Sequence, residues 1–214
     1  MLEISAEQLE RIELILHEIP NGAEKAAYSV IKRAQTTVRS ESIKAITSVY
    51  DISAKTVKQK RYTRIKSQTS KTDDGIIGEV VFAGYKIPLS KFGMKVGKSK
   101  PYRVPVLTSG GNWIMAHPGG TVFARQKRSR PFGNFDKKGT AFAATMPNKG
   151  DGHYSIFERE NSRSTKLSEV QGASAAEMLE EMSVMPRVEA AAMQTISTRM
   201  EHEITRILNG HGMR

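Results

Sequence analysis

Two hydrophobic periods divide this sequence and limit the folds that it can form. Apolar residues recur at three- and four-residue spacing in 5–22, 23–50 and again in 186–210, which predicts amphipathic helices at both ends. Between 62 and 160, short segments rich in Val, Ile, Phe and Tyr are separated by Gly and Pro, which predicts strands. The sequence therefore predicts an α+β fold, in which N-terminal helices and a long C-terminal helix cover an antiparallel sheet or partial barrel.

Capping residues mark where the predicted helices begin and end. Ser5 with Gln8 forms a capping-box pattern, and Asn21 with Glu24 repeats that pattern before the longer second helix. A short third helical turn, a short helix near 175 and the C-terminal helix follow the same logic, with their boundary residues at Ser53, Ser174, Pro186 and Gly210. We expect each of these helices to bury one apolar stripe.

The predicted strands fall within 62–68, 75–84, 85–90, 140–147 and 153–160. Residues 92–139 mix short apolar bursts with Gly, Pro and basic side chains, and predict a long β-hairpin or extended basic arm. We expect one domain over 1–214, with a helical part at 1–60, a β part at 61–160 and a helical part at 161–214. There is no internal repeat.

The net charge of +11 lies in the middle of the chain. Residues 80–150 contain thirteen basic side chains against the single acidic residue Asp136, whereas residues 1–30 contain two basic and six acidic ones. A surface that only maintains solubility mixes both signs, so a block of one sign predicts a face directed at a polyanion. A solvated basic surface with no partner is the alternative interpretation.

The run "KTVKQKRYTRIKSQTSK", residues 55–71, carries seven basic side chains and no acidic one. With "SIKAITSVYDISA" before it, this segment has the helix, turn and second helix of a helix-turn-helix, so a DNA-binding regulator is the alternative function. A recognition helix presents Arg, Asn or Gln to base edges, whereas Lys55, Lys58 and Lys60 are point charges suited to phosphates. The composition therefore favours contact with nucleic acid that does not depend on base sequence.

The residues needed for catalysis are not grouped in this sequence. It has no cysteine, and its five histidines are spread too widely to hold a metal from one helix. In "DGHYS", Asp151, His153 and Ser155 are two residues apart on a predicted strand and cannot form a triad. We therefore predict a protein that is not an enzyme and needs no cofactor or metal. The N-terminus lacks a secretory signal, and no run of 18 apolar residues is present, so we expect the protein to stay in the cell that makes it.

From Gly139 onward the chain resembles the minor tail protein Z family of lambda-type tailed phages and prophages. The resemblance rests on the Ala141-Phe142 strand, a glycine turn at 150–152 and the strand that contains Ile156 and Phe157 followed by Arg159. A leucine-to-methionine element that opens a helix comes next, although Ala173 stands where the family usually has proline. The residues that match the family in this part are Phe157, Arg159, Leu167, Gly172, Ser174 and Met178. The alanine-rich helix and the basic run in the N-terminal half are similar as well.

This resemblance implies a structural protein of the virion, a tail-completion or neck component at the head–tail junction. It implies a homo-oligomeric ring, expected to have six copies, assembled in the host cytoplasm around the path of the genomic DNA. The expected partners are tail terminator or tail tube proteins and head-closure or connector proteins, with no membrane. The candidates for the DNA path or an assembly interface are Lys55, Lys58, Lys60, Arg61, Arg64, Lys66, Arg125, Lys127, Arg128 and Arg130.

Overall fold

The chain divides into two compact units in the computed structural model. Unit 1 comprises Met1–Ile46, Thr63–Ala83 and Leu179–Arg214, and unit 2 comprises Thr47–Tyr62 and Gly84–Met178. The structure describes residues 2–19, 21–72, 75–96, 104–107, 113–116, 122–130, 133–134, 141–146, 153–159 and 166–210. Because both units are built from separate stretches of chain, neither corresponds to one of the three predicted parts, and the expectation of a single domain stays a prediction.

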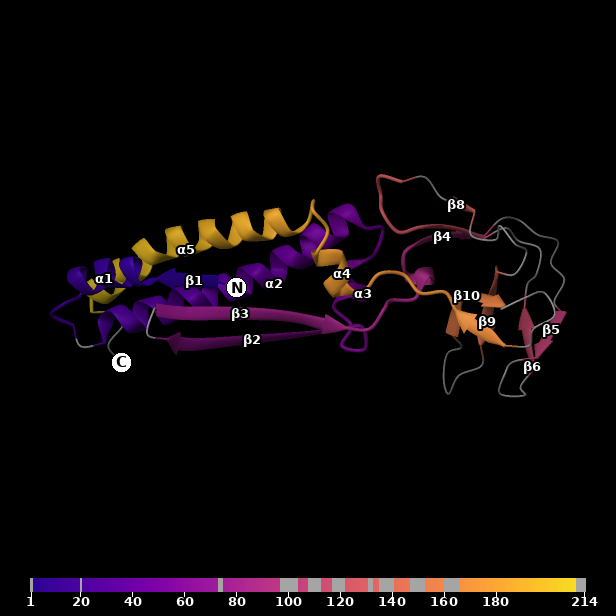
Figure 1. Ribbon diagram of the computed structural model, residues 1–214, viewed down its shortest axis with the longest axis horizontal. Helices are drawn as coiled ribbons and strands as arrows, with labels where there is room; N and C mark the ends of the chain where they lie inside the picture. The colour runs from indigo at the N-terminus through magenta and orange to yellow at the C-terminus, as the bar shows by residue number, and fades with distance from the viewer. Residues whose placement is uncertain are drawn as a thin grey trace. The chain divides into compact units, whose positions relative to one another are not determined.

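Unit 1 combines three helices with a small antiparallel sheet (Figure 1). Its elements are β1 (Leu2–Ser5), α1 (Ala6–Ile15), α2 (Gly22–Val49), β2 (Thr63–Thr72), β3 (Gly75–Gly84) and α5 (Met185–Leu208), of which α2 and β3 end just past the unit boundary. The strand order is β1-β3-β2, with Ile4 opposite Ile76 across β1 and β3. Strand β2 therefore lies at an edge of this sheet.

The core of unit 1 joins the two long helices to one face of the sheet. Small and β-branched residues of α2 pack with residues of β1, β3 and α5 in one buried cluster. This cluster is formed by Ile4, Ala27, Val30, Ile31, Ala34, Ile76, Ala192 and Ile196. A second cluster joins α1, the start of α2 and the end of α5 through Ile12, Leu16, Ala23, Ala26 and Ile207. The expected cover of terminal helices over an antiparallel sheet is confirmed in this unit.

A glycine lets α2 approach the sheet closely. A Cβ atom added to Gly78 of β3 would stand 2.4 Å from Cγ2 of Ile31, so only glycine fits at this position. Beside it the buried amide of Gln35 donates to the carbonyl of Gln68 (2.6 Å), to Oγ1 of Thr69 (3.2 Å) and to the carbonyl of Glu79 (3.4 Å). Helix α2 is thus held to both β2 and β3 by a satisfied polar group within an apolar layer.

Unit 2 is mainly β-structure. Its elements are α3 (Ala54–Val57), the 3₁₀ turn η1 (Leu89–Lys91), β4 (Gly93–Val96), β5 (Val104–Leu107), β6 (Trp113–Ala116), β7 (Val122–Arg125), β8 (Gly133–Asn134), β9 (Ala141–Met146), β10 (His153–Arg159), β11 (Leu167–Glu169) and α4 (Ala175–Leu179). The described strands form one sheet in the order β11-β10-β9-β6-β5 and another in the order β4-β7-β8. All of the pairings between these strands are antiparallel.

The predicted fold class, α+β with a long C-terminal helix, is confirmed. Helix α5 has Pro186 in its first turn and Gly210, at φ +73°, beyond its end. Ser53 caps α3 as expected, with its Oγ accepting from the N–H of Thr56 at 3.1 Å. Within 92–139 the described residues form β4–β8 and a turn at 126–130 after β7, and the β5–β6 pair joins β9. This segment therefore supplies strands to both sheets of unit 2.

The strand predicted at 85–90 is wrong. Residues 85–87 lie outside any helix or strand, and Leu89–Lys91 form the 3₁₀ turn η1. Pro88 has no N–H to donate to a ladder, and it makes only an isolated bridge with Gln171. The short strands β1 and β11 were not predicted, since the segment that contains β11 was expected to be a loop, and the glycine turn at 150–152 lies outside the described residues.

Candidate functional site

The basic run extends from α3 into β2, and every predicted side chain in it is exposed. Thr56 and Val57 of the single turn α3 are buried, so Lys55 and Lys58 face solvent on either side of them. Lys60 and Arg61 follow in the connection, within unit 2. Arg64 and Lys66 belong to unit 1, where their two-residue spacing on β2 places both on the sheet face opposite the helices.

The candidate lysines of this run have no acidic partner among the described residues, unlike Lys71 at its end, which pairs with Glu24 at 3.3 Å. Among the described residues, no ion pair or hydrogen bond from their side chains is found for Lys55, Lys58, Lys60 or Lys66, nor for Arg64. Arg61 differs, because its guanidinium lies 4.4 Å from the ring centre of Tyr62. Burial raises the pKa of Tyr62 above its ordinary value, and the adjacent Arg61 opposes that shift. The lysine charges are therefore available to an external anion.

The second group of candidates, in β7 and the turn after it, is organised around one carboxylate. Arg125 Nε donates to Oδ2 of Asp51 at 3.0 Å, and an Arg128 guanidinium nitrogen lies 3.3 Å from Oδ1. Backbone bonds reinforce the contact, since the N–H of Asp51 donates to Gln126 at 2.7 Å. Gly93 leaves the space, because a Cβ there would stand 2.2 Å from Oδ2 of Asp51. Arg125 and Arg128 thus join β7 to the end of α2 within unit 2.

The other two candidates of this group remain more open. Lys127 is half-buried, and its ammonium lies 5.9 Å from the ring centre of Tyr50. Arg130 is fully on the surface. The structure therefore divides the ten predicted basic residues into the exposed charges of the 55–66 run, two arginines paired with Asp51, the half-buried Lys127 and the exposed Arg130.

The residues that carry the family resemblance lie on neighbouring elements of unit 2. Phe157 of β10 pairs with Phe142 of β9, with ring centres 6.4 Å apart, and the guanidinium of Arg159 lies 5.4 Å from the Phe142 ring centre. Leu167 pairs with Arg159 across β10 and β11. The register of these pairs places the four side chains on one face of the larger sheet.

The other three residues of the resemblance are Gly172 and Ser174, which lie between β11 and α4, and Met178, which lies in α4. Gly172 is buried, its N–H donates to the carbonyl of Ile87 at 2.7 Å, and an added Cβ would stand 2.5 Å from the Phe92 ring. Ser174 forms a capping box with Glu177: the carboxylate accepts from the N–H of Ser174 at 2.7 Å, and Ser174 Oγ accepts from the N–H of Glu177 at 3.3 Å. These bonds hold the pKa of Glu177 below its ordinary value. Met178 is fully buried. The expected cap is confirmed.

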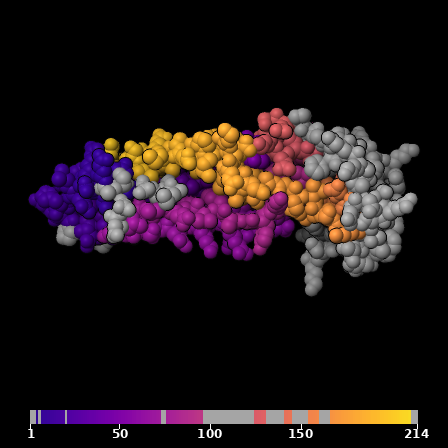
Figure 2. Space-filling view, in the orientation of Figure 1, coloured from indigo at the N-terminus to yellow at the C-terminus, as the bar shows by residue number. Residues whose placement is uncertain are grey.

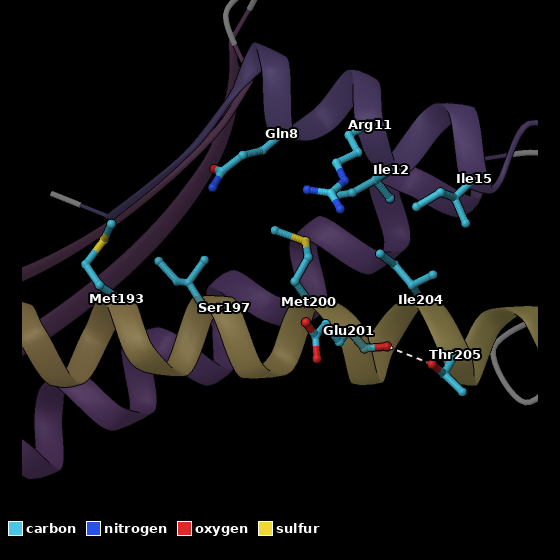
Figure 3. A pocket seen from close by; sticks show the side chains of 11 residues that line it. Gln8, Arg11, Ile12, Ile15, Met193, Ser197, Met200, Glu201, Ile204 and Thr205 are labelled. Carbon is cyan, nitrogen blue, oxygen red and sulfur yellow. Dashed lines mark hydrogen bonds between the residues drawn. The ribbon is translucent and has the colours of Figure 1, made fainter.

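Sequence reasoning missed a groove between α1 and α5 in unit 1 (Figure 3). Its volume is about 450 Å³, and apolar side chains from both helices line it, among them Ile12, Met200 and Ile204. Arg11 extends from α1 toward α5, where Glu201 lies on the opposite wall (Figure 3). Met193 and Ile15 remain 64% and 41% exposed at its rim. In sequence, these two residues are indistinguishable from the buried stripe, so only the folded geometry identifies the groove.

The side chains of α5 also reach the surface on the side away from the core, where they form a continuous ridge in the space-filling view (Figure 2).

His17 and His202 are exposed as expected, while His117, His211 and the side chain of His153 lie outside the described part of the chain. Within that part, no group of three or more His, Cys, Asp or Glu could hold a metal ion, and no helix is long and apolar enough to cross a membrane. No family model, curated protein or solved structure matches the chain.

Proposed function

We propose that this protein is a structural component of a tailed-phage virion, a tail-completion or neck protein that forms a homo-oligomeric ring around the DNA path at the head–tail junction. The resemblance of residues 139–182 to the minor tail protein Z family supplies the proposal. The single observation that carries the DNA contact is the set of exposed lysines at 55–66, which lack acidic partners in the part of the chain that the structure describes.

These lysines are expected to contact DNA because their charges are available to a phosphate. A lysine paired with a carboxylate gains little from a phosphate, because it must give up one partner for the other. Among the described residues, Lys55, Lys58, Lys60 and Lys66 have no such partner to give up, whereas Arg125 and Arg128 are already engaged by Asp51. Ammonium groups are compact and strongly hydrated, so they attract a phosphate backbone without fixing its sequence or register. A ring that must let the genome pass requires that kind of contact.

The alternative, a sequence-specific regulator, is weakened by the geometry of α3. This helix has four residues, Ala54–Val57, two of which are buried. A recognition helix needs enough length to place three or four side chains along base edges in the major groove. One turn with lysines on its surface provides phosphate contacts instead.

The test compares two variants with the same change in charge. The first replaces the exposed run residues Lys55, Lys58, Lys60 and Lys66 by Gln, and leaves Arg61 in place because it packs on Tyr62. The matched control replaces four other exposed lysines, Lys25, Lys44, Lys86 and Lys91, by Gln. Binding of two unrelated duplexes is measured by fluorescence anisotropy between about 20 and 200 mM salt.

We expect the wild-type chain to bind both duplexes equally and to lose affinity steeply with salt. The run variant should have a shallower slope of log K against log salt, by up to about 0.9 for each phosphate contact removed, whereas the control variant should keep most of the slope. Folding should be unaffected, since exposed substitutions change stability by under about 0.5 kcal/mol each. A strong preference for one duplex would favour the regulator, and equal slopes in both variants would remove the run from the DNA path.

A further inference from the structure

A second groove in unit 1, between α2 and α5, has a lining unlike that of the apolar one. Its volume is about 370 Å³, and all of its lining side chains are polar: Arg33, Thr36, Thr37, Ser40, Gln194, Thr195, Thr198 and Arg199. No carboxylate is among them. Two arginines with hydroxyl and amide groups constitute a set of donors suited to a phosphate.

The two arginines lie at the same level of the groove. The core clusters place the start of α2, at Ala26, near Ile207, and place Ala34 near Ile196, so the helices run antiparallel. Arg33 precedes Ala34 on α2 and Arg199 lies three residues after Ile196 on α5, so both residues line the same section of the groove. Two like charges facing one groove repel each other unless an anion lies between them.

Two carboxylates of these helices, Glu203 and Glu41, are engaged elsewhere. Glu203, four residues after Arg199, pairs with Arg206 instead, and Glu41 pairs with Lys44 at 2.6 Å. Neither Arg33 nor Arg199 has an ion-pair or hydrogen-bond partner for its side chain among the described residues. Both guanidiniums can therefore present all of their N–H donors to a ligand.

The hydroxyl groups divide into two kinds. Thr36, Ser40 and Thr195 donate to carbonyls of their own helices, at 2.8–3.0 Å, and so offer only lone pairs to the groove. Thr37, Thr198 and the Gln194 amide make no such bond within the described chain, so their donors are free. Five side chains from two helices can thus donate to one group of oxygens.

We infer that this groove is a phosphate-binding site in which Arg33 and Arg199 flank the oxyanion and Thr37, Thr198 and Gln194 donate to it. This inference rests on the proposed function in one respect, which is that the bound phosphate belongs to the DNA backbone. A free phosphate ion shares the same chemistry and is distinguished by the experiment.

The experiment has two arms on the full chain, each with the same two variants. The test variant is Arg33→Gln/Arg199→Gln, and the control Arg11→Gln/Lys25→Gln removes the same charge from exposed positions on α1 and α2. In the first arm, inorganic phosphate is titrated at constant ionic strength and followed in ¹H–¹⁵N spectra. In the second arm, duplex DNA binding is measured over a salt series.

We expect phosphate to shift the resonances of Thr37 and Thr198 in the wild type and the control, but not in the test variant. Duplex binding should weaken at least tenfold in the test variant, since one charge-assisted hydrogen bond is worth about a factor of ten, and the salt slope should fall by about 2. Equal DNA binding by all three proteins, or phosphate shifts that persist in the test variant, would overturn the inference.

The two arms separate this site from the proposed function. If phosphate shifts Thr37 and Thr198 but no form of the chain binds DNA, the phosphate site stands and the DNA path is refuted. If the lysine-run variant loses DNA affinity while Arg33→Gln/Arg199→Gln binds DNA and phosphate as the wild type does, the DNA path stands and this groove is refuted.

Discussion

Replacing Gly78 by Ala tests the close packing of α2 on the sheet. The new Cβ would stand 2.4 Å from Cγ2 of Ile31 and 3.2 Å from Nε2 of Gln35, so the helix or the Ile31 side chain must move. Overpacking of this kind costs about 1–3 kcal/mol. Gly78 does not have a positive φ, so alanine also regains about 0.5–1 kcal/mol by restricting the unfolded chain. We expect a net loss of about 1–2 kcal/mol in the free energy of unfolding.

Two changes at Ile31 show whether Cγ2 causes that loss. Ile31→Ala removes Cγ2 and should cost about 2–5 kcal/mol alone, because the side chain is fully buried. In that background Gly78→Ala should cost nothing or stabilise the protein. Ile31→Val keeps a methyl group at the same branch and should give no relief. Urea unfolding followed by circular dichroism measures the whole cycle, and the same cost for Gly78→Ala in all three backgrounds would refute the steric explanation.

Three further outcomes follow from unit 2. Asp51→Asn should lower the free energy of unfolding by about 1–3 kcal/mol, because the largely buried Arg125 loses its charged partner, whereas Arg128→Gln should cost under about 1 kcal/mol; chemical denaturation measures both. Gly172→Ala should destabilise the protein by forcing the Phe92 ring aside, and a smaller residue at position 92 should reduce that cost in the same assay. The pKa of Glu177 is lower in the folded state, so its carboxylate stabilises the fold above about pH 5 and loses that effect as the pH falls through the folded pKa. The difference in stability between the wild type and Glu177→Gln should therefore shrink below about pH 4. A difference that does not depend on pH would contradict the capping role.

Local signals in the sequence were sufficient for the helices and for the caps at Ser53 and Ser174, whereas the capping boxes expected at Ser5 and Asn21 stay predictions. Ser53 and Ser174 act through bonds to N–H groups three residues away, so their roles are visible in a short window. The segment 85–90 was misassigned because its β-branched and aromatic residues outweighed Pro88. The strands within 92–139 are two to four residues long and carry no period of their own.

The sites depend on contacts that no short window contains. Asp51 and Arg125 are 74 residues apart, so a basic residue counted toward a polyanion surface proved to belong to an internal ion pair. The grooves beside α5 are formed with α1 and α2 from the other end of the chain. Charge counting could identify Arg33 and Arg199 as basic, but only the antiparallel packing of the helices brings them together.

The central claim is that identical copies of this chain surround the DNA path, and the number and position of copies in a particle test it most directly. Electron microscopy of tailed virions that contain the chain, with the copies located by a tag fused to it, gives both quantities. A closed arrangement of identical contacts should appear as a ring at the head–tail junction, and we expect six copies. A single copy per particle, or copies located away from that junction, would contradict the account.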